Sequence, residues 1–325
     1  MGTSVVRFTT GSSDTLQWGV LKDANVHALA VTADRHREIM ELYYADRPAF
    51  DAAVTADGID ESSVEFHAPL SREIQLIAQG INYASHREEG GLEADAEDEE
   101  NLIFMKASST ISKPNETILR PKGCVLLDYE IELGVVLKTD VAPGTKVTEH
   151  NLGDYVGGLI LCNDVSSRDF MFGAPALQWY KGKSQRTFCP VGPILYLLDD
   201  GDIGKLYSLQ MTLRLNGEVR QSSLTDLMIH KPPATITELA TFTDLSCGDC
   251  IITGTPGGVC TTMNLKSGLA ILLNMKNDKK RREKFIKAQL AVSPYLQPGD
   301  ILELEMASTD GSIDLGKQRN EIADA

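Results

Sequence analysis

Short runs in which hydrophobic and polar side chains alternate recur along the chain, and they predict a protein built mainly from β-strands. The runs 5–8 and 17–21 flank a Gly-Ser-Ser-Asp turn, so we expect them to form a hairpin. The strong turn signal Asn216-Gly217 predicts a second hairpin, between the run 209–215 and the segment that follows. Apolar residues at helical spacing occur in the segments 35–44 and 48–56, and we expect the segment 276–290 to be helical as well.

The bulk composition is that of a globular protein with a sizeable core. The chain has 325 residues, which suits one large domain or two unequal ones, and 42% of them are hydrophobic while 24% are charged. The net charge of −15 argues against a nucleic-acid partner and against docking on an anionic membrane. No apolar run approaches bilayer-spanning length, and the N-terminus has no apolar signal core. Six scattered cysteines indicate reduced thiols, so we expect a cytoplasmic protein.

Three carboxylates mark a candidate metal site. Glu130 and Glu132 are two residues apart in an alternating run, so on a strand they point the same way, about 7 Å apart. Asp164 ends a second apolar run. Burying carboxylates this close requires a compensating cation, and an all-oxygen ligand set suits Mg²⁺, Mn²⁺ or Ca²⁺ rather than zinc. The alternative is that the two glutamates line the solvated face of an edge strand, because the Glu-x-Glu pattern recurs at 303–305.

A histidine and a glutamate follow the strand predicted over 75–80. If a helix begins near Tyr83, His86 and Glu89 share one of its faces, where the carboxylate can orient the imidazole and raise its basicity. An incidental pair on a surface helix is the alternative. The acidic run 91–100 comes directly afterwards and is either a solvated, mobile segment or a flexible lid.

Four further features carry candidate chemistry. Lys183 could pin an anionic substrate near the three carboxylates, or it could be a solvated surface lysine. The turn 253–259 offers backbone donors and two hydroxyls to an anion, but it does not fit the nucleotide-binding fingerprints. Cys247 and Cys250 could form a metal or redox pair, although a Gly-Asp turn explains their spacing. The basic run 279–282 could be a solvated helix face, a subunit contact or an attractor for an anionic substrate.

Taken in order, six segments resemble the fumarylacetoacetate hydrolase family. Each is weak alone, but the ordered set is highly specific and runs from about residue 75 to 325. The segments are Gly80-Ile81-Asn82-Tyr83-Ala84-x-His86, Asp128-Tyr129-Glu130-Ile131-Glu132-Leu133, Asn163-Asp164-Val165-Ser166-Ser167-Arg168-Asp169, Gln178-Trp179-x-x-Gly182-Lys183-Ser184, Pro190-Val191-Gly192-Pro193 and Thr253-Gly254-Thr255-Pro256-x-Gly258-Val259.

The resemblance implies an α+β fold that is mainly β. A mixed β-roll catalytic domain would occupy residues 73–325 and a small N-terminal domain residues 1–72, in a protein that is usually a homodimer. A flexible lid would lie at about 83–104. The segment at about 261–295 is longer than in the smallest members of the family, and this insertion could reshape the mouth of the pocket.

The same resemblance implies a role for each residue of the site. The metal ligands would be Glu130, Glu132 and Asp164, holding Mg²⁺ or Mn²⁺, with Ca²⁺ also possible in crystals. The catalytic residues would be His86 and Glu89, which activate water, and Lys183, which contacts the substrate's oxygens. The substrate-binding residues would be Tyr83, Arg168, Gln178, Lys183 and Thr255.

The implied activity is metal-dependent hydrolysis of a carbon–carbon bond in a β-diketo acid. The substrate would be a small 2-oxo acid such as an acylpyruvate or fumarylpyruvate, as in aromatic catabolism. The same metal–enolate chemistry would also serve an oxaloacetate-type decarboxylase or a 2-oxo-enoate isomerase or hydratase. A non-catalytic, metal-stabilised module would make His86, Glu89 and Lys183 superfluous, and a regulatory binder would show affinity without turnover.

Overall fold

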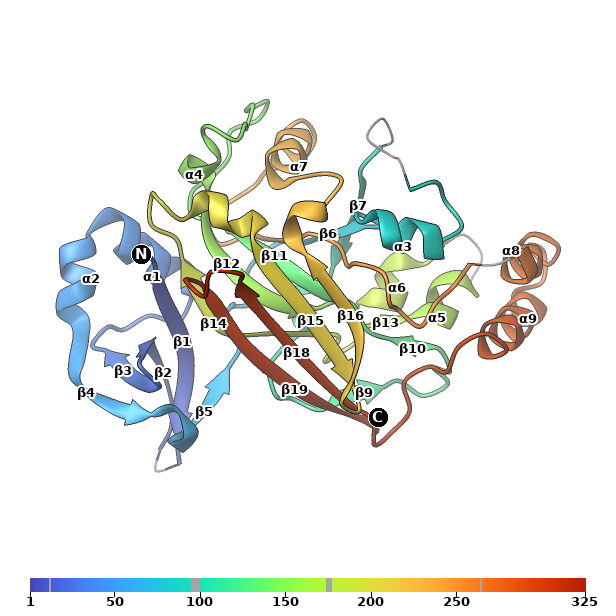
Figure 1. Ribbon diagram of the computed structural model, residues 1–325, viewed down its shortest axis with the longest axis horizontal. Helices are drawn as coiled ribbons and strands as arrows, with labels where there is room; N and C mark the ends of the chain where they lie inside the picture. The colour runs from blue at the N-terminus through green and yellow to red at the C-terminus, as the bar shows by residue number, and fades with distance from the viewer. Residues whose placement is uncertain (12, 95–99, 174–176, 264) are drawn as a thin grey trace.

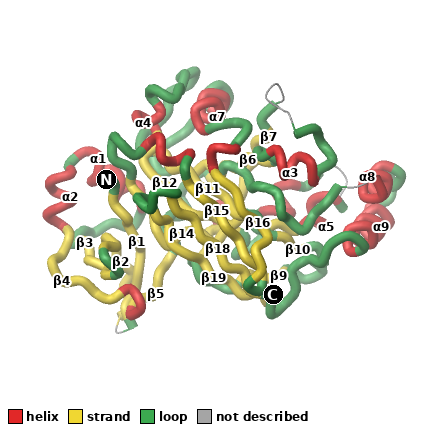
Figure 2. The backbone as a smooth tube through the Cα atoms, in the orientation of Figure 1, coloured by secondary structure: helices red, strands yellow, loops and turns green. Residues whose placement is uncertain are grey.

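The computed structural model describes residues 1–11, 13–94, 100–173, 177–263 and 265–325. Within these residues the chain has an α+β fold dominated by strands, as the sequence predicts, with the helices at the periphery (Figures 1 and 2). Part of the predicted lid, residues 95–99, lies outside the described residues.

Strands of the described residues form one large mixed sheet, a second antiparallel sheet with one parallel edge strand, and a short pair. The large sheet contains β1 (Thr3–Thr10), β2 (Ser13–Lys22), β3 (Asn25–Leu29), β4 (Val54–Asp60), β5 (Val64–His67), β6 (Leu76–Gly80), β7 (Leu102–Lys106), β8 (Ile111–Ser112), β11 (Ile131–Leu137), β12 (Val156–Asn163), β14 (Cys189–Leu197) and β17 (Cys250–Ile252). The second sheet contains β9 (Ile118–Arg120), β15 (Leu209–Leu215), β16 (Glu218–Leu224), β18 (Ile301–Ser308) and β19 (Asp314–Asp324). The short pair is β10 (Leu127–Asp128) with β13 (Ser166–Ser167).

Helices of the described residues are mostly short and lie between strands. The α-helices are α1 (His36–Ala45), α2 (Arg47–Ala53), α3 (Ala84–Glu89), α4 (Leu152–Tyr155), α5 (Arg168–Phe172), α6 (Trp179–Lys183), α7 (Pro232–Leu239), α8 (Leu265–Leu272) and α9 (Asp278–Leu290). The 3-10 turns are Glu61–Ser63, Ser108–Thr110, Ile203–Tyr207 and Thr225–Leu227. In Figure 1, α8 and α9 lie at the opposite end of the molecule from the N-terminal strands.

The central strand β11 is buried on both faces, which explains its nearly continuous apolar sequence. Leu133 and Val135 face a core shared with β15 and β18 of the second sheet. Val136 faces a second core, shared with Cys162 of β12 and with α1 and α2. Because side chains alternate along a strand, Glu132 lies on the face of Val136, at the start of the strand. The sheet therefore carries a carboxylate into a buried position where its second core ends.

The N-terminal strands continue the main sheet rather than standing apart from it. β1 runs antiparallel to β14, with Val5 opposite Leu195. Helix α1 adds a buried contact, because the Nε2 atom of His36 donates a hydrogen bond to the carbonyl of Gly248 at 2.9 Å. The predicted boundary at residues 72 and 73 falls between β5 and β6, and the division into two domains stays a prediction.

Both predicted hairpins are present, as β1–β2 and β15–β16. The helix predicted over 48–56 ends at Ala53, because Val54 begins β4 and pairs with Leu29. Strand pairing on an existing edge overrides the weak helical preference of a β-branched residue there. Within the residues that the structure describes, no helix is both long and apolar enough to span a bilayer.

Candidate active site

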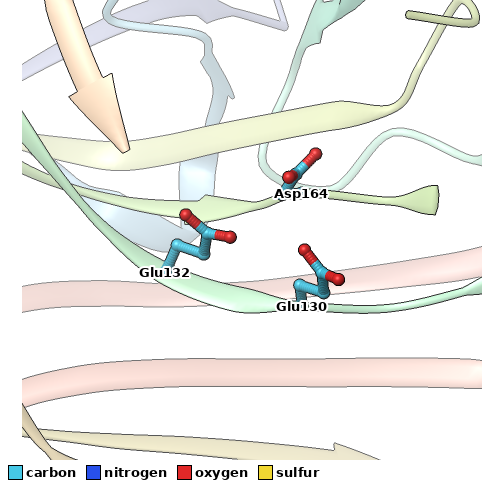
Figure 3. A group of neighbouring side chains, drawn as sticks. All are labelled: Glu130, Glu132 and Asp164. Carbon is cyan, nitrogen blue, oxygen red and sulfur yellow. The ribbon is translucent and has the colours of Figure 1, made fainter. Parts of the chain in front are cut away.

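The three predicted metal ligands converge. Strands β11 and β12 pair antiparallel with Ile131 opposite Asn163, which places Glu130 beside Asp164 at the end of the ladder. The Asp164 amide donates to the Glu130 carbonyl at 2.8 Å and fixes this approach. One oxygen each of Glu130, Glu132 and Asp164 lies within 4.8 Å of the other two, and Figure 3 shows the carboxylates directed toward a common space. All three side chains are buried, so the solvated edge-strand alternative is wrong for Glu130 and Glu132.

Buried cations surround this triad. The ammonium group of Lys183 lies 2.5 Å from Glu130 Oε2 and 2.6 Å from Asp164 Oδ2. Lys106 pairs with the other oxygen of Asp164. Because Lys183 is only 2% exposed, the alternative of a solvated surface lysine is wrong for it. Each ammonium group compensates charge that would otherwise be buried alone.

Arg168 contributes a third buried cation and connects the triad to the insertion. Its guanidinium lies 2.5 Å from Glu130 Oε1 and 2.9 Å from Asp128 Oδ2. Asp128 in turn accepts hydrogen bonds from the amides of Cys260 and Thr261, at 2.8 and 3.1 Å. Arg168 therefore orients Glu130 and ties it to the start of the segment 261–295.

The electrostatic environment separates the two glutamates. Burial and the neighbouring carboxylates of Asp164 and Glu130 raise the pKa of Glu132 well above its usual value. Burial also acts to raise the pKa of Glu130, but the charges of Lys183 and Arg168 outweigh it and lower that pKa. For Lys183, burial acts to lower the pKa, but the carboxylates of Asp164 and Glu130 outweigh it and raise that pKa. Lys183 therefore stays a cation at neutral pH.

The donor set fits a hard divalent cation. Glu132 Oε2 accepts the Gly254 amide at 2.7 Å, but its buried Oε1 has no hydrogen-bond partner among the described residues. An orphaned buried carboxylate oxygen is costly unless a cation meets it. Each carboxylate oxygen of Glu130 and Asp164 uses one lone pair in an ion pair, and its second lone pair remains able to bind a metal ion. Oxygen ligands without sulfur or imidazole suit Mg²⁺, Mn²⁺ or Ca²⁺.

The predicted His-Glu pair is present on α3, which begins after Tyr83 as expected. His86 Nδ1 lies 3.3 Å from Glu89 Oε2. The other carboxylate oxygen of Glu89 accepts the Gly258 amide at 2.7 Å, and Ser85 Oγ accepts the Gly257 amide at 2.9 Å. Two hydrogen bonds thus hold α3 against the turn 253–259. The same turn therefore positions Glu89 of the dyad and, through the Gly254 amide, the metal ligand Glu132.

A cavity of about 180 Å³ is bordered by one residue of the dyad and by one of the metal ligands. His86, Glu130, Arg168, Lys183 and Thr255 line it. One residue predicted to activate water, one predicted metal ligand and three predicted substrate contacts therefore border the same cavity, whereas Glu89, Glu132 and Asp164 are not among its lining residues.

The remaining predicted substrate-binding residues differ in position. Thr255 is buried, and its hydroxyl donates to the Ile131 carbonyl at 2.9 Å, so its proton is already in use. Tyr83 is 1% exposed and its hydroxyl has no hydrogen-bond partner among the described residues, but it does not line the cavity. Gln178 is exposed and also lies outside the cavity lining. The substrate-binding roles of these residues stay predictions.

Sequence reasoning missed Lys106. It is 2% exposed and also approaches the Phe188 carbonyl at 3.0 Å. The available signal was weak, a lysine that closes the apolar run 102–105, because residues 102–105 of β7 are only partly buried or exposed while Lys106 itself is buried.

The insertion packs behind the cavity. Phe285 of α9 contacts Phe172, a cavity residue, with ring centroids 5.5 Å apart. Within the basic run 279–282, Arg281 pairs with Asp278, and the guanidinium of Arg282 lies 2.5 Å from the buried Asp169. Half of that basic run therefore makes ion pairs inside its own chain.

Cys247 and Cys250 are buried. Gly248, between them, has a φ of +91°, and the Asp249 carboxylate accepts the Ser246 amide at 2.8 Å. This geometry is a tight turn, which accounts for the spacing of the two cysteines.

Comparison with known proteins agrees with this geometry. Oxaloacetate tautomerase FAHD2A, mitochondrial, of Bos taurus is 36% identical over 201 residues, and the match covers 62% of each chain. The aligned part thus spans 62% of that relative's length. The 2,4-didehydro-3-deoxy-L-rhamnonate hydrolase of Sphingomonas sp. (strain SKA58) is 31% identical over 281 residues, or 84% of each chain.

Two solved structures share the fold over nearly the whole chain. Fumarylacetoacetate hydrolase (EaFAH) from psychrophilic Exiguobacterium antarcticum superimposes with a TM-score of 0.74 at 26% identity, covering 99% of this chain and 100% of that one. A probable 2-hydroxyhepta-2,4-diene-1,7-dioate isomerase from Mycobacterium abscessus gives a TM-score of 0.72 at 28% identity, covering 100% and 99%. The family pattern described as Fumarylacetoacetate (FAA) hydrolase C-terminal matches residues 75–323. The strands, the buried acidic triad and this match together show that the chain belongs to the fumarylacetoacetate hydrolase family.

Proposed function

We propose that this protein hydrolyses a carbon–carbon bond in a β-diketo acid of the acylpyruvate type. The observation that carries the proposal is the single cavity bordered by His86, Glu130, Arg168 and Lys183. Hydrolysis of this kind requires a base for water, a group that binds a 2-oxo-carboxylate, and a divalent ion. The cavity offers a residue for each requirement.

Glu130, Glu132 and Asp164 would hold the divalent ion, which we propose is Mg²⁺ or Mn²⁺. When bound, such an ion supplies Lewis-acid polarisation of the 2-oxo-carboxylate oxygens and stabilises negative charge on the departing pyruvate carbon. Lys183 adds a fixed cation at the same place, because its ammonium lies between Glu130 and Asp164.

His86 removes a proton from water in the proposed reaction. Glu89 orients the ring through Nδ1, which leaves Nε2 as the base, and the Gly258 amide holds Glu89 in place. The hydroxide attacks C4 of the 2,4-dioxo acid, and the C3–C4 bond breaks. The proton that His86 gained passes to C3, so the products are pyruvate and the carboxylic acid of the acyl group.

Replacing His86 with Ala tests the assignment. We expect the rate of hydrolysis to fall by about 10²- to 10⁴-fold, because a positioned general base contributes about that much. The affinity for Mg²⁺, measured by calorimetry, should stay unchanged, because His86 is not one of the metal ligands. Wild-type turnover in the variant would refute the role of His86 as the base.

A second candidate reaction is proton transfer at C3 of oxaloacetate. Relatives named oxaloacetate tautomerase, which are 36% identical over 201 residues, favour it, and the same residues would serve. Decarboxylation of oxaloacetate, or isomerisation or hydration of a 2-oxo-enoate, would use the same ligands. NMR of metal-loaded protein distinguishes these reactions: pyruvate plus a carboxylic acid marks the hydrolase, pyruvate plus CO₂ the decarboxylase, and accelerated keto–enol exchange without cleavage the tautomerase.

We also propose a homodimer, which sedimentation of the full chain tests directly. The cytoplasmic location stays a prediction, and cell fractionation tests it against the mitochondrial location stated in the names of several relatives.

A further inference from the structure

The segment 265–292, here called the α8–α9 hairpin, has an unusually apolar surface. It consists of α8, α9 and the residues that connect and directly follow them. It holds seven of the sixteen large hydrophobic side chains that are exposed among the described residues. The most exposed are Leu265, Leu272, Leu273 and Met275, with exposed fractions between 64% and 80%. Single apolar side chains are ordinary on a surface, but a cluster in one short segment indicates a contact surface.

The α8–α9 hairpin is also strongly basic, although the protein as a whole is acidic. It has eight lysines and arginines and two acidic residues, so it carries a net charge of +6 and the remainder of the chain −21. Arg281 and Arg282 form ion pairs with Asp278 and Asp169. The six lysines are exposed, and none of them makes an ion pair within the part of the chain that the structure describes. They are Lys266, Lys276, Lys279, Lys280, Lys284 and Lys287.

Leucines and lysines of the hairpin lie around one groove between its two helices. The groove measures about 690 Å³, and its lining includes Leu269 and Leu273 on one side and Lys280, Lys284 and Lys287 of α9 on the other. The three lysines are four and three residues apart, so they share one face of α9. A lysine can keep its ammonium group in a polar layer while its hydrocarbon stem lies along apolar surface. The groove therefore presents apolar contact and positive charge together.

The buried side of the hairpin holds it to the rest of the molecule. Phe285 packs against Phe172, with ring centroids 5.5 Å apart. The side-chain amide of Gln289 donates a hydrogen bond to Ser267 Oγ at 2.8 Å, which ties α9 to α8. Figure 1 shows both helices at the end of the molecule that lies opposite the N-terminal strands. The exposed leucines and lysines are therefore presented on a fixed support at the periphery.

We propose that the α8–α9 hairpin docks this protein on an anionic lipid bilayer. Leu272, Leu273 and Met275 would enter the acyl boundary, where they no longer contact water, while the lysines meet the anionic headgroups. The net charge of −15 predicts the opposite for the molecule as a whole. Exposed charges more than a Debye length apart, about 8 Å at physiological ionic strength, are largely screened from one another. The basic surface that faces the bilayer therefore decides the sign of the interaction.

Other partners match this surface less well. A two-fold contact through the hairpins of two copies would bring a charge of +6 against an equal charge of +6. A contact between the hairpin and the acidic surface of another copy would be heterologous, and such contacts form open chains unless the rotation closes them into a ring. A nucleic acid would match the lysines but leave the leucines in water. A bilayer satisfies both kinds of side chain at once.

Sedimentation of the full chain with lipid vesicles tests the proposal. One set of vesicles contains equal amounts of phosphatidylcholine and phosphatidylserine, and the other contains phosphatidylcholine alone. We expect the protein to bind the anionic vesicles at least about tenfold more strongly, and added salt to weaken that binding. No binding to the anionic vesicles, or equal binding to both sets, would overturn the proposal.

Charge variants separate the hairpin from the charge of the whole protein. Lys280→Gln, Lys284→Gln and Lys287→Gln together should weaken binding to the anionic vesicles about 100-fold, because each lysine near such a surface contributes about fivefold. The matched control makes the same change of net charge at three exposed lysines outside the hairpin, which are Lys22, Lys146 and Lys317. The control should bind as the wild type does. An equal loss in both triple variants would show that net charge rather than the hairpin governs binding, and would reject the assignment.

Apolar variants test insertion of the leucines. Leu272→Ser combined with Leu273→Ser should weaken binding to the anionic vesicles at least about tenfold, because the serines gain nothing from leaving water. Both positions are more than 60% exposed, so urea unfolding should match that of the wild type. Leu16→Ser with Phe242→Ser, at exposed positions outside the hairpin, is the control that should bind normally. Undiminished binding of the leucine variant would refute insertion. Self-association without lipid that only the leucine variant loses would show that a second copy covers the hairpin, and would equally refute the proposal.

Discussion

Lys106 provides the most direct test of how charge is balanced in the metal site. Replacing it with Met removes a buried ammonium group while keeping most of the side-chain volume. Among the residues that the structure describes, Asp164 then keeps only Lys183, at 2.6 Å, as its ion-pair partner. Removing one partner of a buried ion pair costs about 3–5 kcal/mol. Because Lys183 still compensates the charge of Asp164, we expect the free energy of unfolding to fall by about 3 kcal/mol, near the lower end of this range.

The affinity for Mg²⁺ should change in the opposite direction. Lys106 bonds to an oxygen of Asp164, so its charge would be roughly 5 Å from an ion held by the same carboxylate, given ordinary metal–oxygen and hydrogen-bond lengths. At an effective dielectric constant of about 20, the two positive charges of Mg²⁺ and the single charge of Lys106 repel by several kcal/mol at that distance. Relaxation of the surrounding structure reduces this repulsion. We therefore expect Lys106→Met to bind Mg²⁺ at least about tenfold more tightly than the wild type.

Two measurements on metal-free protein check both parts, namely urea unfolding and calorimetric titration with Mg²⁺. The matched control is Lys113→Met, because Lys113 pairs with Glu65 at 2.6 Å but its side chain is 39% exposed. The control should lose less than about 1 kcal/mol and keep the wild-type Mg²⁺ affinity. A Lys106→Met protein that binds Mg²⁺ no more tightly than the wild type would refute the view that Lys106 and the metal compete for the same negative charge.

Three further predictions follow from particular contacts. Burial lowers the pKa of His36 from 6.5 to about 4, so the folded protein binds fewer protons than the unfolded chain at intermediate pH. Stability is thus lost as the pH falls through 6.5, by about 2 kcal/mol between pH 7 and 5, and urea unfolding should show that His36→Gln removes this dependence. Gly254 has a φ of +85°, and a Cβ there would be 2.7 Å from Asn82, so Gly254→Ala should lower the free energy of unfolding by about 1–3 kcal/mol and weaken Mg²⁺ binding by displacing the amide that holds Glu132. Glu89→Gln keeps an acceptor for the Gly258 amide but removes the charge beside His86, so kcat should fall by about 10- to 100-fold with little change in KM.

Each of these has a result that would contradict it. If the free energy of unfolding of His36→Gln varies with pH as that of the wild type does, a group other than His36 causes the pH dependence. Gly217 also has a positive φ, +83°, but lies in open space, so Gly217→Ala should leave Mg²⁺ affinity unchanged. Equal loss of affinity in both glycine variants would mean that backbone strain alone is responsible. A Glu89→Gln protein with wild-type kcat would remove Glu89 from the dyad.

The two Glu-x-Glu patterns show where sequence reasoning stops. Glu130 and Glu132 are buried beside Asp164, whereas Glu305 is about one-third exposed and pairs with Arg214 and Lys317 at the surface. Alternation predicts correctly in both cases that the two glutamates share a face. Whether that face is covered depends on which strands and helices pack over it, and the pattern itself carries no such information.

Local signals determined the parts of this protein that depend on neighbours in sequence. Alternating runs and an Asn-Gly turn predict the hairpins, and the spacing of His86 and Glu89 predicts their contact on α3. The ordered motifs also predicted Lys183 as a residue of the site, and in the structure its ammonium lies between Glu130 and Asp164. These predictions succeed because backbone geometry fixes which side chains meet over a few residues.

Only the tertiary structure decided which distant groups share the buried charge. Lys106 meets Asp164 across 58 residues, and Arg168 meets Asp128 across 40. It also decided that Phe172, Trp179 and Glu130, which come from three different segments of the chain, line the same cavity. Such contacts arise from strand pairing and from covering each face of the sheet, which minimise exposed apolar surface over the whole chain rather than over any one segment.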